Sequence, residues 1–181
     1  TAPDKTHKSF PEIIQMLAKV RAHGGNMLLN VGPDVRGVIP LRERTTLKQV
    51  GKWLTNNGES VYGVQKSPYH DLPWGVCTHK PGKLFLHIID MPSSDFLFLP
   101  GLKSKISKVC FLADSGKSPL NFAKVDGGWN IELKTEGIPA DVFNEASTVL
   151  VVEYEGELDV DPSTVLDHDL DNRFIVPLAK K

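Results

Sequence analysis

The sequence predicts a short helix–strand–helix α/β unit followed by an antiparallel all-β sandwich. Apolar residues recur at helical spacing on both sides of a short apolar run at residues 27–29, which predicts the α/β unit. From Val61 onwards, short strand-like segments follow one another with turn residues between them and no helical pattern, as in a sandwich or barrel. We expect the α/β unit over residues 1–60, the sandwich over 61–156 and an acidic C-terminal extension over 157–181.

The composition is that of an ordinary folded protein. The chain has 181 residues, of which 40% are hydrophobic and 24% charged, and this excludes global disorder. A net charge of −1 gives no electrostatic reason to expect binding to nucleic acid or to an anionic membrane. No apolar run approaches the roughly 20 residues of a membrane-spanning helix. The first residue is Thr1 and no signal-peptide pattern follows it, so we expect the native start and any targeting signal to lie outside this sequence.

The first helix is predicted over residues 9–23. Ser9 and Glu12 form a capping-box pattern, with Pro11 in the first turn. Gly24 suits a left-handed cap at the end of the helix. One face of the helix is apolar and carries Phe10, Ile13, Ile14, Leu17 and Val20.

A strand over residues 26–31 and a second helix over residues 41–56 follow. The apolar run is too short for a helix and lacks a clean alternation, which indicates a strand buried on both faces, and the Gly-Pro pair at residues 32–33 ends it. Pro40 opens the second helix, and residues 56–58 (Asn-Asn-Gly) end it. The apolar stripe of this helix is Leu47, Val50 and Leu54.

The sandwich is predicted from seven strand-like segments at residues 75–78, 84–89, 96–99, 106–112, 120–125, 129–133 and 149–154. The sequence Asp-Gly-Gly at residues 126–128 predicts a hairpin between two of them. His87 alternates with Leu84, Leu86 and Ile88, so we expect it to face solvent or to be hydrogen-bonded.

The remaining polar and aromatic residues form no catalytic or metal-binding pattern. Cys77 and Cys110 are expected to be buried free thiols, with a single bridge as the alternative. Three aromatic side chains of the β part are more typical of a core than of a sugar-stacking surface, namely Tyr69, Trp74 and Trp129. Residues 167–171 imitate the start of a calcium loop, but Asn172 and Leu178 stand where the loop needs Gly and Glu, so we expect a solvated acidic tail.

A distinctive series of residues resembles a known family. It reads GGNMLLNVGP at residues 24–33, VGKWL at 50–54 and NGESVYG at 57–63, with Gly37 and residues 39–40 (Ile-Pro) correctly spaced between them. This series resembles the end of the catalytic domain in the α-L-fucosidases of glycoside hydrolase family 29, over about residues 8–63. The departures are small: Val-Arg-Gly at residues 35–37 replaces an acidic residue and Gly, and Ser60 stands where Ala is common.

The resemblance implies the last helix–strand–helix of a (β/α)8-like barrel. Residues 9–23 would be its seventh helix, 26–31 its eighth strand and 41–56 its eighth helix. Because barrel enzymes place their active sites at the C-terminal ends of the strands, Asn30, Gly32 and Pro33 would border the sugar pocket. The alternative is that Asn30 only ties the end of the strand to neighbouring backbone.

The family is one of retaining exo-glycosidases that remove terminal α-L-fucose from glycans without a cofactor or metal. Its Asp nucleophile and Glu acid/base stand about 5–5.5 Å apart, and both come from segments that precede the part matched here. The acidic residues near the α/β unit match neither position: Asp4, Glu12, Asp34, Glu43 and Glu59. The resemblance therefore implies that the 181-residue chain has no catalytic residue of its own and is inactive alone, and that the whole enzyme is secreted, periplasmic or lysosomal.

A lone barrel strand needs partners on both edges. We expect these from the missing barrel segment or from a second copy of the chain. We also expect the second helix to pack against the sandwich, with Trp53, Leu54 and Tyr62 at the contact. The sandwich itself could alternatively bind carbohydrate or a protein partner, or act only as structural support.

Overall fold

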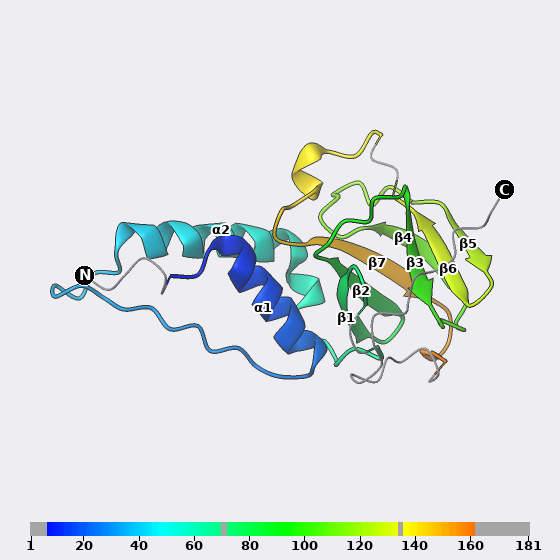
Figure 1. Cartoon of the computed structure of the whole chain (residues 1–181), viewed down its shortest axis with the longest axis horizontal. Coiled ribbons are helices and arrows are strands. Elements are labelled where there is room, and N and C mark those ends of the chain that lie inside the picture. Colours follow the sequence, from blue (N-terminus) through cyan, green and yellow to red (C-terminus); the bar gives the residue numbers. More distant parts are fainter. Residues whose placement is uncertain (1–6, 70–71, 134–135, 162–181) are drawn as a thin grey trace.

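The computed structural model describes residues 7–69, 72–133 and 136–161, and these contain two α-helices and two antiparallel sheets (Figure 1). The helices are α1 (Phe10–Ala22) and α2 (Leu41–Asn57). The strands are β1 (Gly75–Lys80), β2 (Lys83–Ile88), β3 (Phe96–Pro100), β4 (Ile106–Phe111), β5 (Phe122–Val125), β6 (Gly128–Glu132) and β7 (Thr148–Tyr154). Short 3₁₀ turns lie at Gly58–Ser60 and Ala140–Val142. Neither described α-helix has the length and apolar character needed to cross a membrane.

The N-terminal end of α1 confirms the predicted capping box. The Ser9 amide donates to Glu12 Oε2 at 2.6 Å, and the Glu12 amide donates to Ser9 Oγ at 3.4 Å, which satisfies two amides that the helix leaves open. The helix ends where Gly24 takes a φ of +79°, as the sequence predicts.

The strand predicted over residues 26–31 is not formed. Residues 25–34 run along the helices without a strand assignment (Figure 1), and within the described chain no backbone hydrogen bond joins residues 26–33 to another segment. A strand exists only through its ladder, and no other described strand lies beside this one to provide a ladder. Burial alternates instead, because Met27 and Leu29 pack on the helix side while Leu28 is 95% exposed.

The β part forms the predicted sandwich. One sheet has the order β1-β2-β7-β4 and the other β3-β6-β5, and every pairing within them is antiparallel. The predicted hairpin joins β5 to β6, and Gly127 provides its turn with a φ of +76°.

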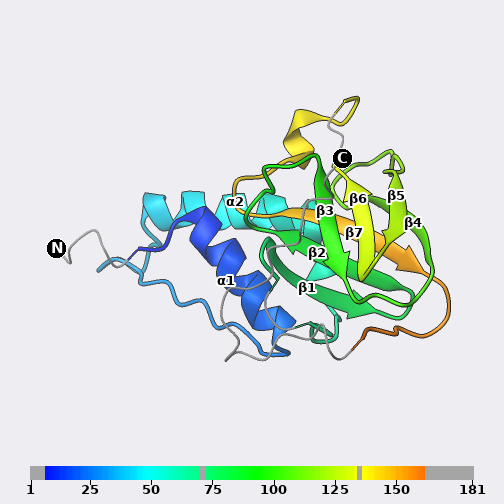
Figure 2. The same ribbon diagram turned by 45° about the vertical axis from the view of Figure 1, so that its right-hand side comes forward.

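The four-stranded sheet is the middle of three layers, because α1 and α2 cover one of its faces and the smaller sheet covers the other (Figure 2). Alternate residues of β2 and β7 face the smaller sheet, among them Leu84, Leu86, Leu150 and Val152. The residues between them pack under the helices, among them Phe85, Val149 and Val151. This sheet therefore has no solvated face over β2 and β7.

The predicted contact between the second helix and the sandwich is correct for Trp53 and Leu54 but wrong for Tyr62. Trp53 is 4% exposed, and its Nε1 donates to the Ser147 carbonyl at 3.0 Å, while Leu54 packs on the same cluster. Tyr62 is 62% exposed. The turn at Gly58–Ser60 lays the ring over Gly58, at whose position a Cβ atom would lie 3.1 Å from Tyr62 Cε2, and so directs it away from the sheet.

The prediction for His87 was also wrong. Its side chain has 0% exposure, and neither ring nitrogen has a hydrogen-bond partner among the described residues. The alternation of β2 predicts one buried and one solvated face, but α2 covers the second face, and the Trp53 ring stacks on His87 with centroids 6.3 Å apart.

The predicted core residues of the sandwich are confirmed. Cys77 and Cys110 are buried free thiols on opposite faces of the four-stranded sheet, Cys77 toward the smaller sheet and Cys110 toward the helices. Tyr69, Trp74 and Trp129 are buried between the sheets. Residues 167–171, whose sequence resembles the start of a calcium-binding loop, lie outside the described residues.

Candidate functional site

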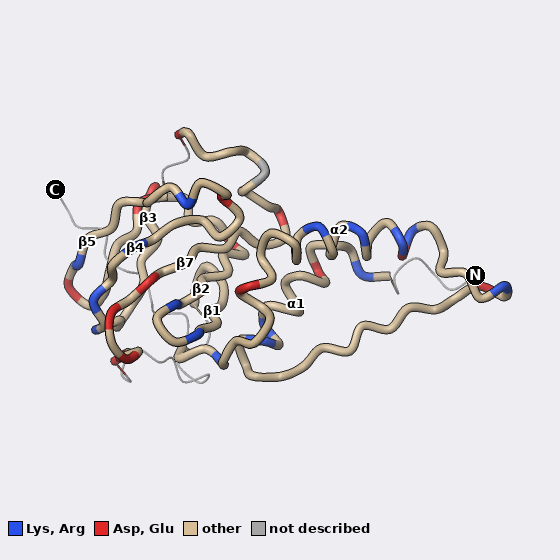
Figure 3. Tube along the Cα trace, turned by 180° about the vertical axis from the view of Figure 1, so that it is seen from behind, with Lys and Arg blue, Asp and Glu red and all other residues tan. Residues whose placement is uncertain are grey.

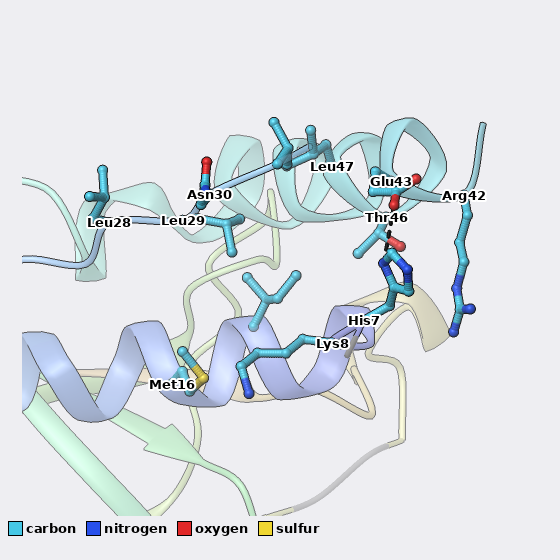
Figure 4. Close-up of a pocket in the computed structure, with 12 residues that line it drawn as sticks. His7, Lys8, Met16, Leu28, Leu29, Asn30, Arg42, Glu43, Thr46 and Leu47 are labelled. Atoms are coloured by element: carbon cyan, nitrogen blue, oxygen red, sulfur yellow. Dashed lines mark ion pairs between the residues drawn. The ribbon is translucent and has the colours of Figure 1, made fainter. Parts of the chain in front are cut away.

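The candidate site is a cleft between the N-terminal half of α1, residues 28–31 and the N-terminal half of α2, and its volume is about 260 Å³ (Figure 4). Its walls combine apolar side chains with a few polar ones. They are His7, Lys8, Ile13, Met16, Leu28, Leu29, Asn30, Val31, Arg42, Glu43, Thr46 and Leu47.

Arg21 fixes the start of residues 25–34, the segment that forms one wall of this cleft. From the end of α1 its guanidinium donates to the Gly25 carbonyl at 2.6 Å and to Asn26 Oδ1 at 3.2 Å. It also donates to the carbonyls of Val61 and Val64, at 3.2 and 3.0 Å. One side chain thus ties the start of residues 25–34 to the chain that leads into the sandwich.

The polar centre of the cleft is a pair formed by His7 and Glu43. His7 Nδ1 lies 3.1 Å from Glu43 Oε1, and Figure 4 shows the two side chains meeting between the N-terminal end of α1 and α2. The second carboxylate oxygen of Glu43 is buried and has no partner among the described residues. Lys8 and Arg42 also line the cleft.

The described residues of this cleft can bind a polar group but do not include the pair of carboxylates that glycoside hydrolysis uses. Both stereochemical routes require two carboxyl groups on either side of the scissile bond. Glu43 is the single acidic side chain among the described residues of the cleft wall. The described residues also contain no cluster of three or more metal-ligating side chains.

The structure places one of the three predicted rim residues in the cleft wall. Asn30 lines it, and Figure 4 shows the Asn30 side chain pointing away from α1, while Gly32 and Pro33 lie beyond the wall and are exposed. The role of these three residues at the rim of a sugar pocket stays a prediction.

Three other acidic residues near the α/β unit have structural partners. Asp34 accepts hydrogen bonds from the amides of Arg36 and Val38, at 2.9 and 3.0 Å, and its pairing with the Arg36 guanidinium is the main reason that its pKa lies below the usual range. Glu12 caps α1, and Glu59 Oε1 accepts from Lys83 Nζ at 2.7 Å.

The sequence did not predict the His7–Glu43 pair, because the two residues are far apart in the chain and share no recognisable spacing.

A second cleft of about 430 Å³ lies between the C-terminal half of α2 and residues 142–145. Its wall is rich in amide side chains, among them Gln49, Asn56, Asn57 and Asn144. Basic residues follow the exposed side of α2 beside it, as Figure 3 shows, and those with exposed side chains are Arg42, Arg44, Lys48 and Lys52.

Comparison with known proteins connects the α/β unit to one family. A family model described as α-L-fucosidase matches residues 1–59. A plasma α-L-fucosidase from Rattus norvegicus is 41% identical over 96 residues, which cover 50% of this chain and 21% of the rat protein. An α-L-fucosidase from Dictyostelium discoideum is 33% identical over 98 residues, which cover 51% of this chain and 21% of that protein. The chain thus spans about a fifth of the length of these relatives.

Solved structures extend the similarity into the β part. The α-L-fucosidase isoenzyme 1 from Paenibacillus thiaminolyticus aligns with a TM-score of 0.74 and 28% identity, over 86% of this chain and 37% of the other. The α-L-fucosidase from a Vibrio species aligns with a TM-score of 0.74 and 30% identity, over 88% of this chain and 28% of the other. A family 29 α-L-fucosidase from Bacteroides thetaiotaomicron shares the fold, with a TM-score of 0.71 and 20% identity over 82% of this chain and 33% of the other. Together these findings show that the α/β unit is similar in sequence to part of the α-L-fucosidases, and that most of the chain shares the fold of solved α-L-fucosidases.

Proposed function

We propose that the chain is the C-terminal portion of a retaining exo-α-L-fucosidase that removes terminal α-L-fucose from glycans. The observation that carries this proposal is the match of residues 1–59 to the α-L-fucosidase family, which coincides with α1, residues 26–31 and α2. The relatives in both the sequence and the structure comparison are α-L-fucosidases.

In this proposal the nucleophile and the acid/base lie outside these 181 residues. The chain spans about a fifth of the length of these relatives, and among its described residues the cleft offers one carboxylate where retaining hydrolysis needs two. The chain alone is therefore expected to be inactive, and the whole enzyme uses no metal or cofactor.

The same proposal assigns α1, residues 26–31 and α2 to the last helix–strand–helix of a (β/α)8-like barrel. Residues 26–31 have the alternating burial of a strand with one covered face, yet within the described chain their backbone has no ladder partner. Strands contributed by the rest of the barrel would pair with both edges and would cover the exposed side chain of Leu28. Asn30, Gly32 and Pro33 would then follow the C-terminal end of this strand, where barrel enzymes bind their substrates.

The test is a fusion protein in which this chain replaces the aligned segment of the Paenibacillus enzyme. We expect the isolated chain to leave an aryl α-L-fucoside intact and the fusion protein to hydrolyse it, because the barrel would then be complete. A folded but inactive fusion protein would contradict the family function, and turnover by the isolated chain would contradict the placement of the catalytic carboxylates.

A matched pair of variants tests the assignment of the barrel strand. Leu28→Asp puts a charge on the face that we expect the barrel to cover, so it should leave the stability of the isolated chain within about 0.5 kcal/mol and abolish the activity of the fusion protein. Val35→Asp is the control, because Val35 is equally exposed but lies in the following turn. Equal activity of the two fusion variants would rule out the strand assignment.

A further inference from the structure

The contact between α2 and the four-stranded sheet contains a buried titratable side chain, His87, that takes no part in the proposed function. His87 lies on the face of β2 that also carries Phe85, under α2, and is opposite Val76 of β1 and Val149 of β7 in the sheet register. Its ring is fully buried and stacks on Trp53 with an interplanar angle of 30°.

The hydrogen-bonding groups around the ring are already used by other partners. Trp53 Nε1 donates to the Ser147 carbonyl at 3.0 Å, and Thr78 Oγ1 donates to the Ser60 carbonyl at 2.7 Å. Both ring nitrogens of His87 and the hydroxyl of Ser147 lack a partner among the described residues. A neutral imidazole tolerates this site at moderate cost, whereas an imidazolium would bring two N–H donors and a charge into it, and the Ser60 backbone, which interacts with the ring, already accepts from Thr78.

Among the described residues, no charged side chain compensates for this burial. Burial lowers the pKa of His87 to about 4, and an interaction of the ring with the Ser60 backbone partly opposes this shift. None of the charged residues on the elements packed around it contributes to the shift. They are Arg21 of α1, Lys52 of α2, Glu59 with its partner Lys83, Lys80 of β1, and Glu153 of β7.

We propose that His87 is an acid-sensitive latch that holds α2 on the four-stranded sheet while its ring is neutral and releases α2 when the ring takes up a proton. The released element is α2, because the indole of Trp53 is both the stacking partner of His87 and the donor of the side-chain hydrogen bond from α2 to Ser147.

The direction of the pH dependence follows from the lowered pKa. The unfolded or released chain, with a His pKa of about 6.5, binds the proton more readily than the packed chain, so the packing is fully stable above about pH 6.5 and loses stability as the pH falls toward about 4. At about pH 4 this single group should raise the open-to-closed ratio on the order of a hundredfold.

The test compares the 181-residue chain with His87→Phe, which keeps an aromatic ring against Trp53 but cannot take up a proton. Hydrogen exchange at the Trp53 indole N–H and at the α2 amides is measured at about pH 7 and about pH 4, with each rate corrected for its intrinsic pH dependence. We expect the parent chain to open much more often at the lower pH and the variant to lose most of this increase. His23→Phe is the control, because His23 is an exposed histidine beyond the end of α1 and should leave the increase unchanged.

A second measurement does not depend on the folding of a variant. Titration of the histidine ring signals of the parent chain by NMR should give His87 an apparent pKa near 4, with loss of the α2 contacts over the same pH range. A His87 pKa above about 6, an acid response that persists in His87→Phe, or α2 exchange that is independent of pH would each overturn the proposal.

Discussion

Trp53 is the residue that contributes most clearly to holding the α/β unit on the sandwich. Its indole stacks on His87, donates to the Ser147 carbonyl and is buried with Phe10 of α1 and Val149 of β7 in one cluster. A large aromatic side chain with a satisfied N–H is suited to such a site, since its ring is buried while its polar atom is paired.

Two substitutions separate these contributions. Trp53→Ala should lower the free energy of unfolding by about 3–5 kcal/mol, because it leaves a cavity in the cluster. Trp53→Phe should cost less, with about 1–3 kcal/mol from the Ser147 carbonyl left without its donor. Urea denaturation gives both values, and Tyr62→Ala, on an exposed aromatic of the same region, should stay within about 0.5 kcal/mol of the parent chain. Equal losses for the Trp53 and Tyr62 variants would contradict the role of Trp53.

At the scale of elements, two glycines show how differently helices and strands depend on the absence of a side chain. Gly51 is an exposed interior residue of α2, and a Cβ there would meet nothing within 4 Å. Gly75 begins β1 with a φ of +150°, and a Cβ there would lie 2.0 Å from the His87 carbonyl oxygen. The first glycine is dispensable for packing, and the second lets two strands approach each other.

The expected effects of alanine at these positions have opposite signs. Gly51→Ala should stabilise the chain by about 0.5–1 kcal/mol, because it removes backbone freedom from the unfolded chain and supplies a better helix former. Gly75→Ala should destabilise it by at least about 1–3 kcal/mol through backbone strain and the clash with β2. Thermal unfolding midpoints provide the comparison, and a stabilised Gly75→Ala variant would show that the start of β1 can rearrange.

Elements with local signals could be predicted from the sequence within a few residues. Ser9 and Glu12 mark the start of α1, Pro40 precedes α2, and Gly127 marks the β5–β6 turn. The failures concern residues whose environment is set by distant segments. His87 is buried because α2 covers β2, and residues 26–31 are not a strand because a strand requires a partner that the described chain does not provide. The His7–Glu43 contact likewise depends on tertiary packing alone.

At the scale of the whole molecule, the position of the four-stranded sheet between two layers links their stabilities. Residues of α1 and α2 share one cluster with Phe85, Val149 and Val151, while the neighbouring residues of the same strands pack against the smaller sheet. Loss of either outer layer would therefore expose one face of β2 and β7. Unfolding of one layer should thus lower the stability of the other.

This arrangement predicts a single cooperative transition near neutral pH. In urea at about pH 7, helix content from far-UV circular dichroism and tryptophan fluorescence should follow the same curve, because α2 and the sandwich share a core. At about pH 4 the two curves should separate, with helix content lost first and only the Trp53 part of the fluorescence change accompanying it, since protonation of His87 weakens only the helix side of the sheet while Trp74 and Trp129 lie between the sheets. In His87→Phe they should stay together at both pH values. Curves that separate already at about pH 7 would mean that the helix pair is not part of the folding unit of the sandwich, whatever the state of His87.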